Sequence, residues 1–375
     1  MNTLGIIFSY TERENLRELT KRRTLSSLPF AGKYRMIDVI LSNYVNSDVT
    51  DVSIITKDNY HSLMDHVGAG KEWDLTRKKG GLRVLTPYSS PEMPVHAGMY
   101  RGDVEALSRN MHSIRRSMAE YVVLSGSGTL YSMNYKDVVE QHIETNADIT
   151  AVYTRSMNGS KIVPPGVVIF DMDETGRIKD LKYNTNGTDE QDVAWCIGAV
   201  VIKKSLLESL VADAMSYQEY DFYEGIMKRL ANNLNIRGYE YTGYVMEISS
   251  VTDYMKANMS LLDKEMADKF YQAPIYTKIK DSVPVQYCDG CSVKNSIVAD
   301  GCKIEGTVEN SIISRGVRIG KGAVIKNSII MQNTEIMANV VLDHVILDKD
   351  VIVRENRQLI GHETYPVVVE KLSIV

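Results

Sequence analysis

The sequence lacks both a long hydrophobic run and a surplus of basic residues. No stretch approaches the roughly 20 consecutive apolar residues needed to cross a bilayer, and residues 1–8 lack the basic segment that opens a signal peptide. The net charge of −5 argues against a nucleic-acid partner, because surfaces that bind nucleic acids are usually basic. These absences predict a cytoplasmic protein that binds neither membranes nor nucleic acids. They do not exclude small anions, which need only a local cluster of Lys and Arg.

Cysteine is also scarce. The four cysteines are Cys196, Cys288, Cys291 and Cys302. The pair Cys288-x-x-Cys291 has the spacing of half a zinc site, but a second pair at matching spacing is missing and no His lies nearby. We therefore interpret the cysteines as buried, reduced thiols and expect no metal site.

What the sequence does contain is typical of a soluble globular protein of two domains. Its 375 residues exceed one ordinary domain, and 44% of them are hydrophobic and 24% charged. The first 262 residues alternate strand-like segments (4–8, 51–56, 121–125, 149–154 and 196–202) with helix-like segments (38–46, 60–66, 104–118, 135–145, 205–213 and 221–231). This alternation predicts an α/β domain with a largely parallel sheet. Ligands bind beyond the carboxyl ends of such strands, so residues 8–15 and 125–129 lie where a nucleotide pocket is expected.

After about residue 280 the helical pattern stops and short β-branched pairs recur. Asn-Ser-Ile appears at 295, 310 and 327. Apolar residues fall on a six-residue ladder at 317, 323, 329, 341, 347 and 353, interrupted by Glu335. Hexapeptide periodicity predicts a parallel β-helix. An antiparallel sandwich is the alternative, but its strands would be longer and bounded by hairpin signals such as Asn-Gly.

Ordered sequence blocks resemble the ADP-glucose pyrophosphorylase (glucose-1-phosphate adenylyltransferase) family. The segment LPFAGKYRMID at 28–38 is similar to the family's PFGGKYRIIDF, and LSNYVNS at 41–47 is similar to LSNCVNSG. Further similar blocks follow in the family's order at 73–77, 100–102, 147–150, 220–222, 243–244 and 257–262. With the hexapeptides they cover nearly the whole chain.

The resemblance implies a fold, a reaction and an assembly. The implied fold is α/β, a Rossmann-like nucleotidyltransferase domain (1–262), then a linker (263–284) and a left-handed parallel β-helix (285–375), in tetramers. The implied reaction joins glucose 1-phosphate to ATP, giving ADP-glucose and pyrophosphate by in-line attack on the α-phosphorus. Because such catalysis rests on positioning and charge neutralisation by Mg²⁺, Lys and Arg, each part is open to inspection.

The family's phosphate loop, AGGxGTRL, has lost its glycines here. The aligned residues are 9–16, in which Tyr10 and Thr11 replace the paired glycines, Arg13 stands at a further glycine-loop position, and Asn15 replaces the loop arginine. Glycine backbone N–H groups cradle phosphates in such loops, so this loop cannot do so. Downstream, Leu25 replaces a phosphate-contacting lysine.

Other chemical positions of the family are altered too. Ser127 replaces a metal-binding aspartate, and a hydroxyl is a poor Mg²⁺ ligand compared with a carboxylate. Glu247 replaces the second metal aspartate, and Asn184 replaces a lysine that contacts glucose 1-phosphate. Each such part typically contributes about 10²-fold or more to catalysis. We therefore expect no catalytic residues and no cofactor in this chain, with Mg²⁺ reserved for a catalytic partner.

This combination of intact scaffold and lost chemistry resembles the family's degenerate, GlgD-type regulatory subunit. That resemblance implies a hetero-tetramer with a catalytic subunit and an anionic effector bound by Lys33 and Arg35. Gly102, Asp103 and Cys196 fall where a residual substrate pocket is expected. The basic run 21–23 is more simply interpreted as a solvated turn.

Two alternatives stay open. An active sugar nucleotidyltransferase would need a phosphate cradle elsewhere, and no other glycine-rich loop follows a strand. A free-standing sensor of sugar phosphates or nucleotides would need no partner, and the sequence does not show partner surfaces.

Overall fold

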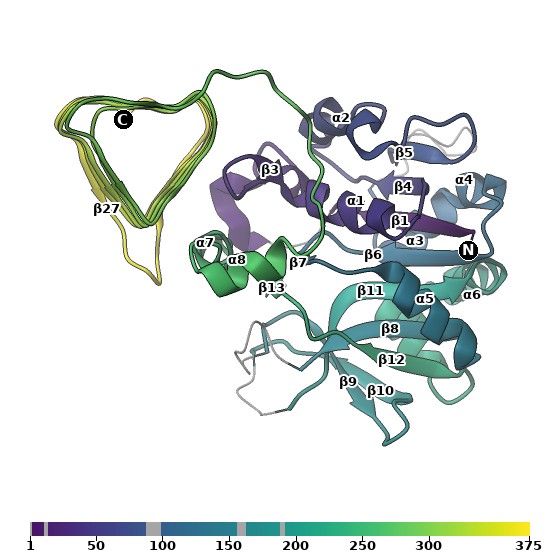
Figure 1. The fold of residues 1–375 in the computed structure, drawn as a ribbon. Coiled ribbons are helices and arrows are strands. Elements are labelled where there is room, and N and C mark those ends of the chain that lie inside the picture. The colour runs from purple at the N-terminus through teal and green to yellow at the C-terminus, as the bar shows by residue number, and fades with distance from the viewer. Residues whose placement is uncertain (1, 11–13, 88–98, 156–162, 188–191) are drawn as a thin grey trace.

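The computed structural model describes residues 2–10, 14–87, 99–155, 163–187 and 192–375, which form an α/β domain followed by a β-helix (Figure 1). Within these ranges, none of the helices combines the length and the apolar character of a membrane span. The β-helix is triangular in cross-section and lies beside the α/β domain (Figure 1).

A mixed sheet forms the centre of the α/β domain, with nine strands in the described ranges. The path of neighbouring strands is β10-β9-β11-β6-β1-β4-β5, and β8 joins β11 to β12. The bounds are β1 (Thr3–Phe8), β4 (Asp51–Ile55), β5 (Gly81–Leu85), β6 (Tyr121–Ser125), β8 (Ile149–Thr154), β9 (Val168–Met172), β10 (Ile178–Tyr183), β11 (Trp195–Lys203) and β12 (Ile236–Glu240). Strands β1, β6 and β8 are buried on both faces, as near-continuous apolar runs require.

Helices cover both faces of this sheet. One hydrophobic core joins the sheet to α1 (Met36–Asn46), α2 (His61–Val67) and α5 (Tyr135–Glu144). The other joins it to α3 (Asp103–Arg109), α4 (Met111–Arg116), α6 (Lys204–Ser216) and the π-helical turn η4 (Tyr223–Lys228). Smaller elements complete the domain: η1 (Glu14–Leu19), η2 (Leu25–Ser27), β2 (Pro29–Phe30), β3 (Tyr34–Arg35), η3 (Lys71–Trp73), β7 (Thr129–Tyr131), β13 (Val245–Glu247) and α7 (Val251–Ser260).

Two sequence-based expectations for this domain were wrong in detail. The sheet is mixed rather than largely parallel, because β11 runs antiparallel to both β6 and β8. The helix expected over 104–118 is broken at Asn110, whose side-chain amide donates to the carbonyl of Ala106 and to the hydroxyl of Tyr100. An Asn side chain that competes for backbone groups favours a helix end.

The C-terminal domain is the expected left-handed β-helix, since its short strands stack into three parallel sheets of five strands each in the described residues. The first sheet contains β14 (Gln286–Tyr287), β17 (Lys303–Ile304), β20 (Arg318–Ile319), β23 (Glu335–Ile336) and β26 (Ile352–Val353). The second contains β15 (Ser292–Lys294), β18 (Thr307–Glu309), β21 (Val324–Lys326), β24 (Val341–Asp343) and β27 (Gln358–Ile360). The third contains β16 (Ile297–Val298), β19 (Ile312–Ile313), β22 (Ile329–Ile330), β25 (Val345–Leu347) and β28 (Val367–Val369).

The Asn-Ser-Ile repeat forms one corner of the β-helix. Asn310 and Asn327 adopt the left-handed conformation that turns the chain. The Oγ of Ser311 accepts the backbone N–H of Ser328, 3.1 Å away in the next coil, and the following isoleucine, Ile312 or Ile329, enters the core. The three residues of the repeat therefore supply the turn, the coil-to-coil hydrogen bond and the core contact in that order.

The six-residue ladder is displaced by one residue in the fourth coil. Leu342 and Ile336 are buried, whereas Val341 is only half-buried and Glu335 is exposed. The interruption at Glu335 is not a gap in the core, because Glu335 lies opposite the exposed Arg318 and its neighbour Ile336 lies opposite the buried Ile319.

The segment expected to be a plain linker, 263–284, contains a helix and is fixed to the α/β domain. Helix α8 (Lys264–Phe270) begins where Asp263 accepts the N–H of Met266, and it ends at Phe270, whose buried ring packs on Phe30 and Tyr244. The chain then runs past α1 and α2 to the β-helix (Figure 1).

The segment 271–284, which we call the connecting strand although it joins no sheet in the described structure, is held in place by hydrogen bonds. Asn46 donates to the carbonyl of Pro274 at 2.8 Å, and the hydroxyl of Thr277 donates to the Asp38 carboxylate at 2.5 Å. The Nζ of Lys278 donates to the carbonyl of Asp65 at 2.7 Å.

Candidate functional site

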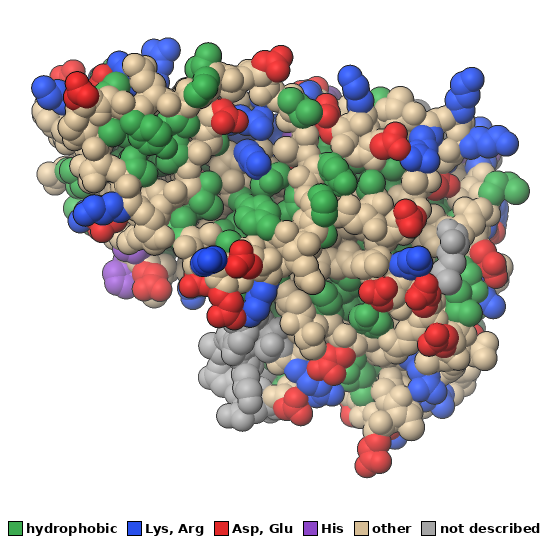
Figure 2. Space-filling model, in the orientation of Figure 1, with side chains coloured by type: hydrophobic (Ala, Val, Ile, Leu, Met, Phe, Trp, Pro, Cys, Tyr) green, Lys and Arg blue, Asp and Glu red, His purple; other side chains and the backbone are tan. Residues whose placement is uncertain are grey.

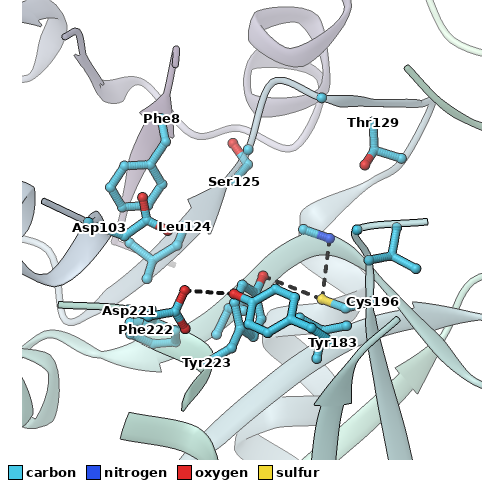
Figure 3. A pocket seen from close by; sticks show the side chains of 18 of the residues that line it. Phe8, Asp103, Leu124, Ser125, Thr129, Tyr183, Cys196, Asp221, Phe222 and Tyr223 are labelled. Atoms are coloured by element: carbon cyan, nitrogen blue, oxygen red, sulfur yellow. Dashed lines mark hydrogen bonds between the residues drawn. The ribbon is translucent and has the colours of Figure 1, made fainter. Parts of the chain in front are cut away.

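A cavity of about 460 Å³ lies at the carboxyl ends of β1 and β6 (Figure 3). This volume is within the range of small-molecule sites. The start of the antiparallel strand β11 meets these ends, so three strands bring their ends to one place. The wall includes Phe8, Tyr10, Gly102, Asp103, Tyr183, Cys196, Asp221, Phe222, Tyr223 and Glu247.

Tyrosine hydroxyls hold two of the carboxylates in this wall. The hydroxyl of Tyr183 donates to Asp221 at 2.6 Å (Figure 3), and that of Tyr10 donates to Asp103 at 3.2 Å. Burial and the neighbouring Asp221 charge both raise the pKa of Tyr183, so its proton stays on the phenol. The sequence pattern did not single out Tyr183 or Asp221, although 220–222 was one of the family-like blocks.

Gly102 is required by a close approach of two backbones. A Cβ at this position would lie 2.3 Å from the carbonyl oxygen of Tyr220. The same carbonyl accepts the N–H of Val104 at 2.9 Å, which holds the start of α3 against the cavity. Asp103, the first residue of α3, is placed in the wall by this contact.

Cys196 lies in the wall with its thiol buried. Its Sγ is 3.4 Å from the hydroxyl of Tyr223 and accepts the N–H of Gly198 at 3.3 Å (Figure 3). Burial raises the pKa of the thiol to about 11, so it is not a nucleophile near neutral pH.

Ser127 and Glu247, which align with the family's metal-binding aspartates, take different places relative to the cavity. The side chain of Ser127 is 0% exposed, outside the cavity wall, and its Oγ has no partner among the described residues. Glu247 is in the wall, and the hydroxyl of Thr129 donates to it. No grouping of three metal-type side chains occurs in the described parts of the chain.

Other degenerate positions have structural roles. Leu25 is buried in η2 and packs in the core that joins the two domains. Asn184 donates to the carbonyl of Pro164 at 2.9 Å and stabilises the turn beside β10. Thr11 and Arg13 lie outside the described residues, and of Asn15 only its backbone place in η1 is described.

The charge of the described cavity wall is acidic. It contains three carboxylates, those of Asp103, Asp221 and Glu247, against one guanidinium, that of Arg101. Arg101 is committed elsewhere, since its Nε donates to Glu105 at 3.0 Å and its guanidinium stacks on Tyr220. Such a wall disfavours a polyphosphate.

A second, smaller cavity of about 40 Å³ lies between the two domains. It has room for about three water molecules, comparable to a small oxyanion. Six cationic side chains line it: Lys33, Arg35, Lys278, Lys280, Arg315 and Lys349. We call this the cationic pocket. Figure 2 shows Lys and Arg side chains in the hollow between the β-helix and the α/β domain.

Three separate parts of the chain supply these cations. The β2–β3 hairpin supplies Lys33 and Arg35, and its turn at Gly32 (φ 78°) abuts the β-helix near Ile313. The connecting strand supplies Lys278 and Lys280. The β-helix supplies Arg315 and Lys349, which occupy the same position two coils apart, or about 10 Å at the usual strand spacing.

Crowding of like charges perturbs these groups. Burial, and after it the charge of Arg23, lowers the pKa of Arg35 although the carboxylates of Asp38 and Asp65 oppose the shift. Burial and then the charge of Arg35 lower the pKa of Lys280. Burial and then the charges of Arg35 and Arg23 lower the pKa of Lys349 to about 7. Because cations outnumber the nearby carboxylates, such a cluster favours an anion.

The sequence predicted only Lys33 and Arg35 of this pocket. The other four cations come from segments more than 240 residues away along the chain, with no local pattern to join them. For Arg315 and Lys349, the sequence offered one indication of a shared site, namely their equivalent positions in the coil repeat. Lys278 and Lys280 had none.

Comparison with known proteins places both domains. A family model described as nucleotidyl transferase matches residues 5–264, and one described as GlmU-like, C-terminal hexapeptide matches residues 283–365. Two proteins named glycogen biosynthesis protein GlgD are similar to the chain. The one from Bacillus subtilis (strain 168) is 36% identical, with 98% of this chain and 95% of the relative covered. The one from Geobacillus stearothermophilus is 35% identical, with 86% and 82% covered. The glucose-1-phosphate adenylyltransferase of Fervidobacterium nodosum is 28% identical, with 96% and 86% covered.

Proposed function

Because the chain belongs to the nucleotidyl transferase family, in its glucose-1-phosphate adenylyltransferase branch, we propose that it is a non-catalytic or weakly catalytic regulatory subunit of that enzyme in glycogen biosynthesis. In this proposal it assembles with a catalytic subunit, as a hetero-tetramer, in the cytoplasm. The catalytic subunit supplies Mg²⁺ binding and turnover.

One observation carries the loss of catalysis. A buried serine hydroxyl, that of Ser127, stands in place of a metal carboxylate, outside the cavity wall. Nearby, Glu247 accepts a hydrogen bond from Thr129. A triphosphate and its cation would therefore meet an acidic wall without a carboxylate pair arranged around a metal. Losses of this kind cost about 10²-fold each in transition-state stabilisation.

The regulatory half of the proposal rests on the cationic pocket. Its cations come from both domains and from the strand between them, so an anion bound there contacts all three. Lys33 and Arg35 are the residues for which the family resemblance implied this role. A ligand that favours one arrangement of the domains shifts their equilibrium by its differential affinity, which gives an effector a physical route to the partner.

A mixed assay tests this proposal. This chain and a catalytic adenylyltransferase subunit from the same organism are each assayed for ADP-glucose formation, first alone and then together, with and without inorganic phosphate. We expect this chain alone to be at least about 10²-fold slower than its partner, and the mixture to co-elute with a changed kcat, KM or phosphate response. Robust turnover by this chain alone would identify an active transferase. Unchanged kinetics without co-elution would instead favour a free-standing sensor.

A further inference from the structure

One lysine of the cationic pocket, the partly buried Lys349, stands among cations without a counter-ion of its own in the described part of the chain. Among the residues that the structure describes, its Nζ forms no hydrogen bond or ion pair. Its neighbour Asp348 is already engaged by the guanidinium of Arg23 and by the backbone N–H of Lys349. Burial and the neighbouring cations make the charged form of this amine less favourable than in an ordinary lysine.

We propose that Lys349 takes up a proton when an oxyanion enters the cationic pocket, so that the pocket binds its ligand more tightly as the pH falls. This inference rests on the proposed function, because it takes the pocket to be an anion site. One proton passes from solvent to the neutral amine and forms an N–H bond, and no other bond changes. The ligand and the proton therefore bind as a linked pair.

The surroundings of Lys349 set the direction of this linkage. Cations face it from the hairpin, the connecting strand and the β-helix, and His66 faces it from α2, paired with Asp38 at 2.5 Å. The charged and titratable groups that face it are Arg23, Lys33, Arg35, His66, Lys278, Lys280, Arg315 and Asp348. The nearby carboxylates Asp348 and Asp38 are already paired, with Arg23 and His66 respectively. Because cations outnumber them around the pocket, an added dianion makes the surroundings less positive and favours the charged amine.

The pH window follows from the lowered pKa of Lys349, about 7 in the free protein. Below this pH the amine is already charged, so binding takes up no proton and affinity is at its maximum. Above it, binding must include protonation, and affinity falls by up to tenfold per pH unit. A bound anion raises the pKa, and affinity levels off again once the pH exceeds that higher value.

Sulfate is a suitable probe because it has no proton to lose in this range, whereas a phosphate monoester titrates near about pH 6. Calorimetric titration of the full chain with sulfate, at pH 6 and pH 8, is expected to give about tenfold weaker binding at pH 8. Two buffers of different ionisation enthalpy should show nearly one proton taken up at pH 8 and almost none at pH 6.

Lys349→Arg is the matched variant, because a guanidinium keeps its charge throughout this range. We expect it to bind sulfate at pH 8 about as tightly as at pH 6, without proton uptake. Lys349→Met, which also cannot titrate, should bind more weakly at both pH values and likewise lose the uptake. It serves as the second measurement if the arginine does not fit.

Four outcomes are distinguishable. Failure of the unaltered chain to bind sulfate at any pH would remove the anion site and, with it, the regulatory half of the proposed function. Equal binding at both pH values with no proton uptake would overturn the inference alone. Uptake that survives in Lys349→Arg but vanishes in Lys280→Arg would assign the proton to Lys280. Uptake that survives in Lys349→Arg but vanishes in His66→Gln would assign it to His66.

Discussion

The guanidinium of Arg23 is paired with the carboxylate of Asp348 inside the contact between the two domains, where their side chains are 5% and 1% exposed. The same guanidinium approaches the sulfur of Met331, so it is enclosed by the β-helix. Arg23 was expected to lie on a solvated basic turn, and that interpretation was wrong for this residue. Lys21 and Arg22 do lie at the surface, paired with Glu370 at 3.2 Å each.

Arg23→Ala should destabilise the protein by about 3–5 kcal/mol, because it leaves the Asp348 charge buried without its partner. The measurement is the free energy of unfolding in urea. A double variant, Arg23→Met with Asp348→Leu, removes both charges and should be clearly more stable than the single variant. If the single variant is as stable as the unaltered chain, the Arg23–Asp348 pair does not contribute to the stability of the contact between the domains.

Glu105 gives a prediction in pH. Although burial opposes its ionisation, hydrogen bonds from Arg101 and Arg109 prevail and lower its pKa to about 2. A lowered carboxyl pKa stabilises the fold above the unfolded value, and this contribution is lost as the pH falls through about 2. Glu105→Gln should therefore lower the thermal midpoint at neutral pH. The gap between variant and unaltered chain should narrow as the pH is lowered from about 4.5 toward 2, and a constant gap over that range would contradict the assignment.

Gly102→Ala should disturb the start of α3 and the strand-end cavity, since its Cβ would overlap the Tyr220 carbonyl. We expect a loss of about 1–3 kcal/mol in unfolding free energy, as for other overpacked sites. Gly126→Ala is the control, because a Cβ there meets nothing within 4 Å. If both alanines cost the same, close backbone approach is not the reason for the glycine at 102.

Arg315→Ala should weaken the response of the mixed complex to inorganic phosphate by at least about tenfold, as loss of a charge-assisted contact would. Arg318→Ala is the matched control, because the exposed Arg318 lies nearby on β20 but does not line the pocket, and it should leave the response unchanged. The measurement is the phosphate concentration for half-maximal effect on ADP-glucose formation. Equal effects of the two variants would point to general screening instead of a pocket.

The β-helix could be predicted from sequence because its physics is local and repeated. Asn at a left-handed corner, Ser bonded to the next coil and Ile in the core recur at nearly constant spacing, so each coil signals the same structure. Where the spacing shifts by one residue, as at Ile336 and Leu342, the ladder was misread. The buried positions of the β-helix are still apolar after the shift, as Ile336 and Leu342 show.

The sites could be predicted only where a motif fell in one segment. The sequence singled out Lys33 and Arg35 because they share a block, and Gly102, Asp103 and Cys196 because they align with family positions. No local sequence pattern marks Lys349, because its lowered pKa comes from burial and from cations that folding brings near it. Ser127 was predicted to replace a family aspartate, and its burial away from the cavity follows from packing that no local pattern encodes.

The cationic pocket also makes the cohesion of the molecule depend on ionic strength. Its like charges repel across the junction of hairpin, connecting strand and β-helix, and dissolved salt weakens that repulsion. The domains should therefore be held together more firmly in moderate salt than in dilute buffer. A surface ion pair has the opposite dependence, because salt weakens its attraction.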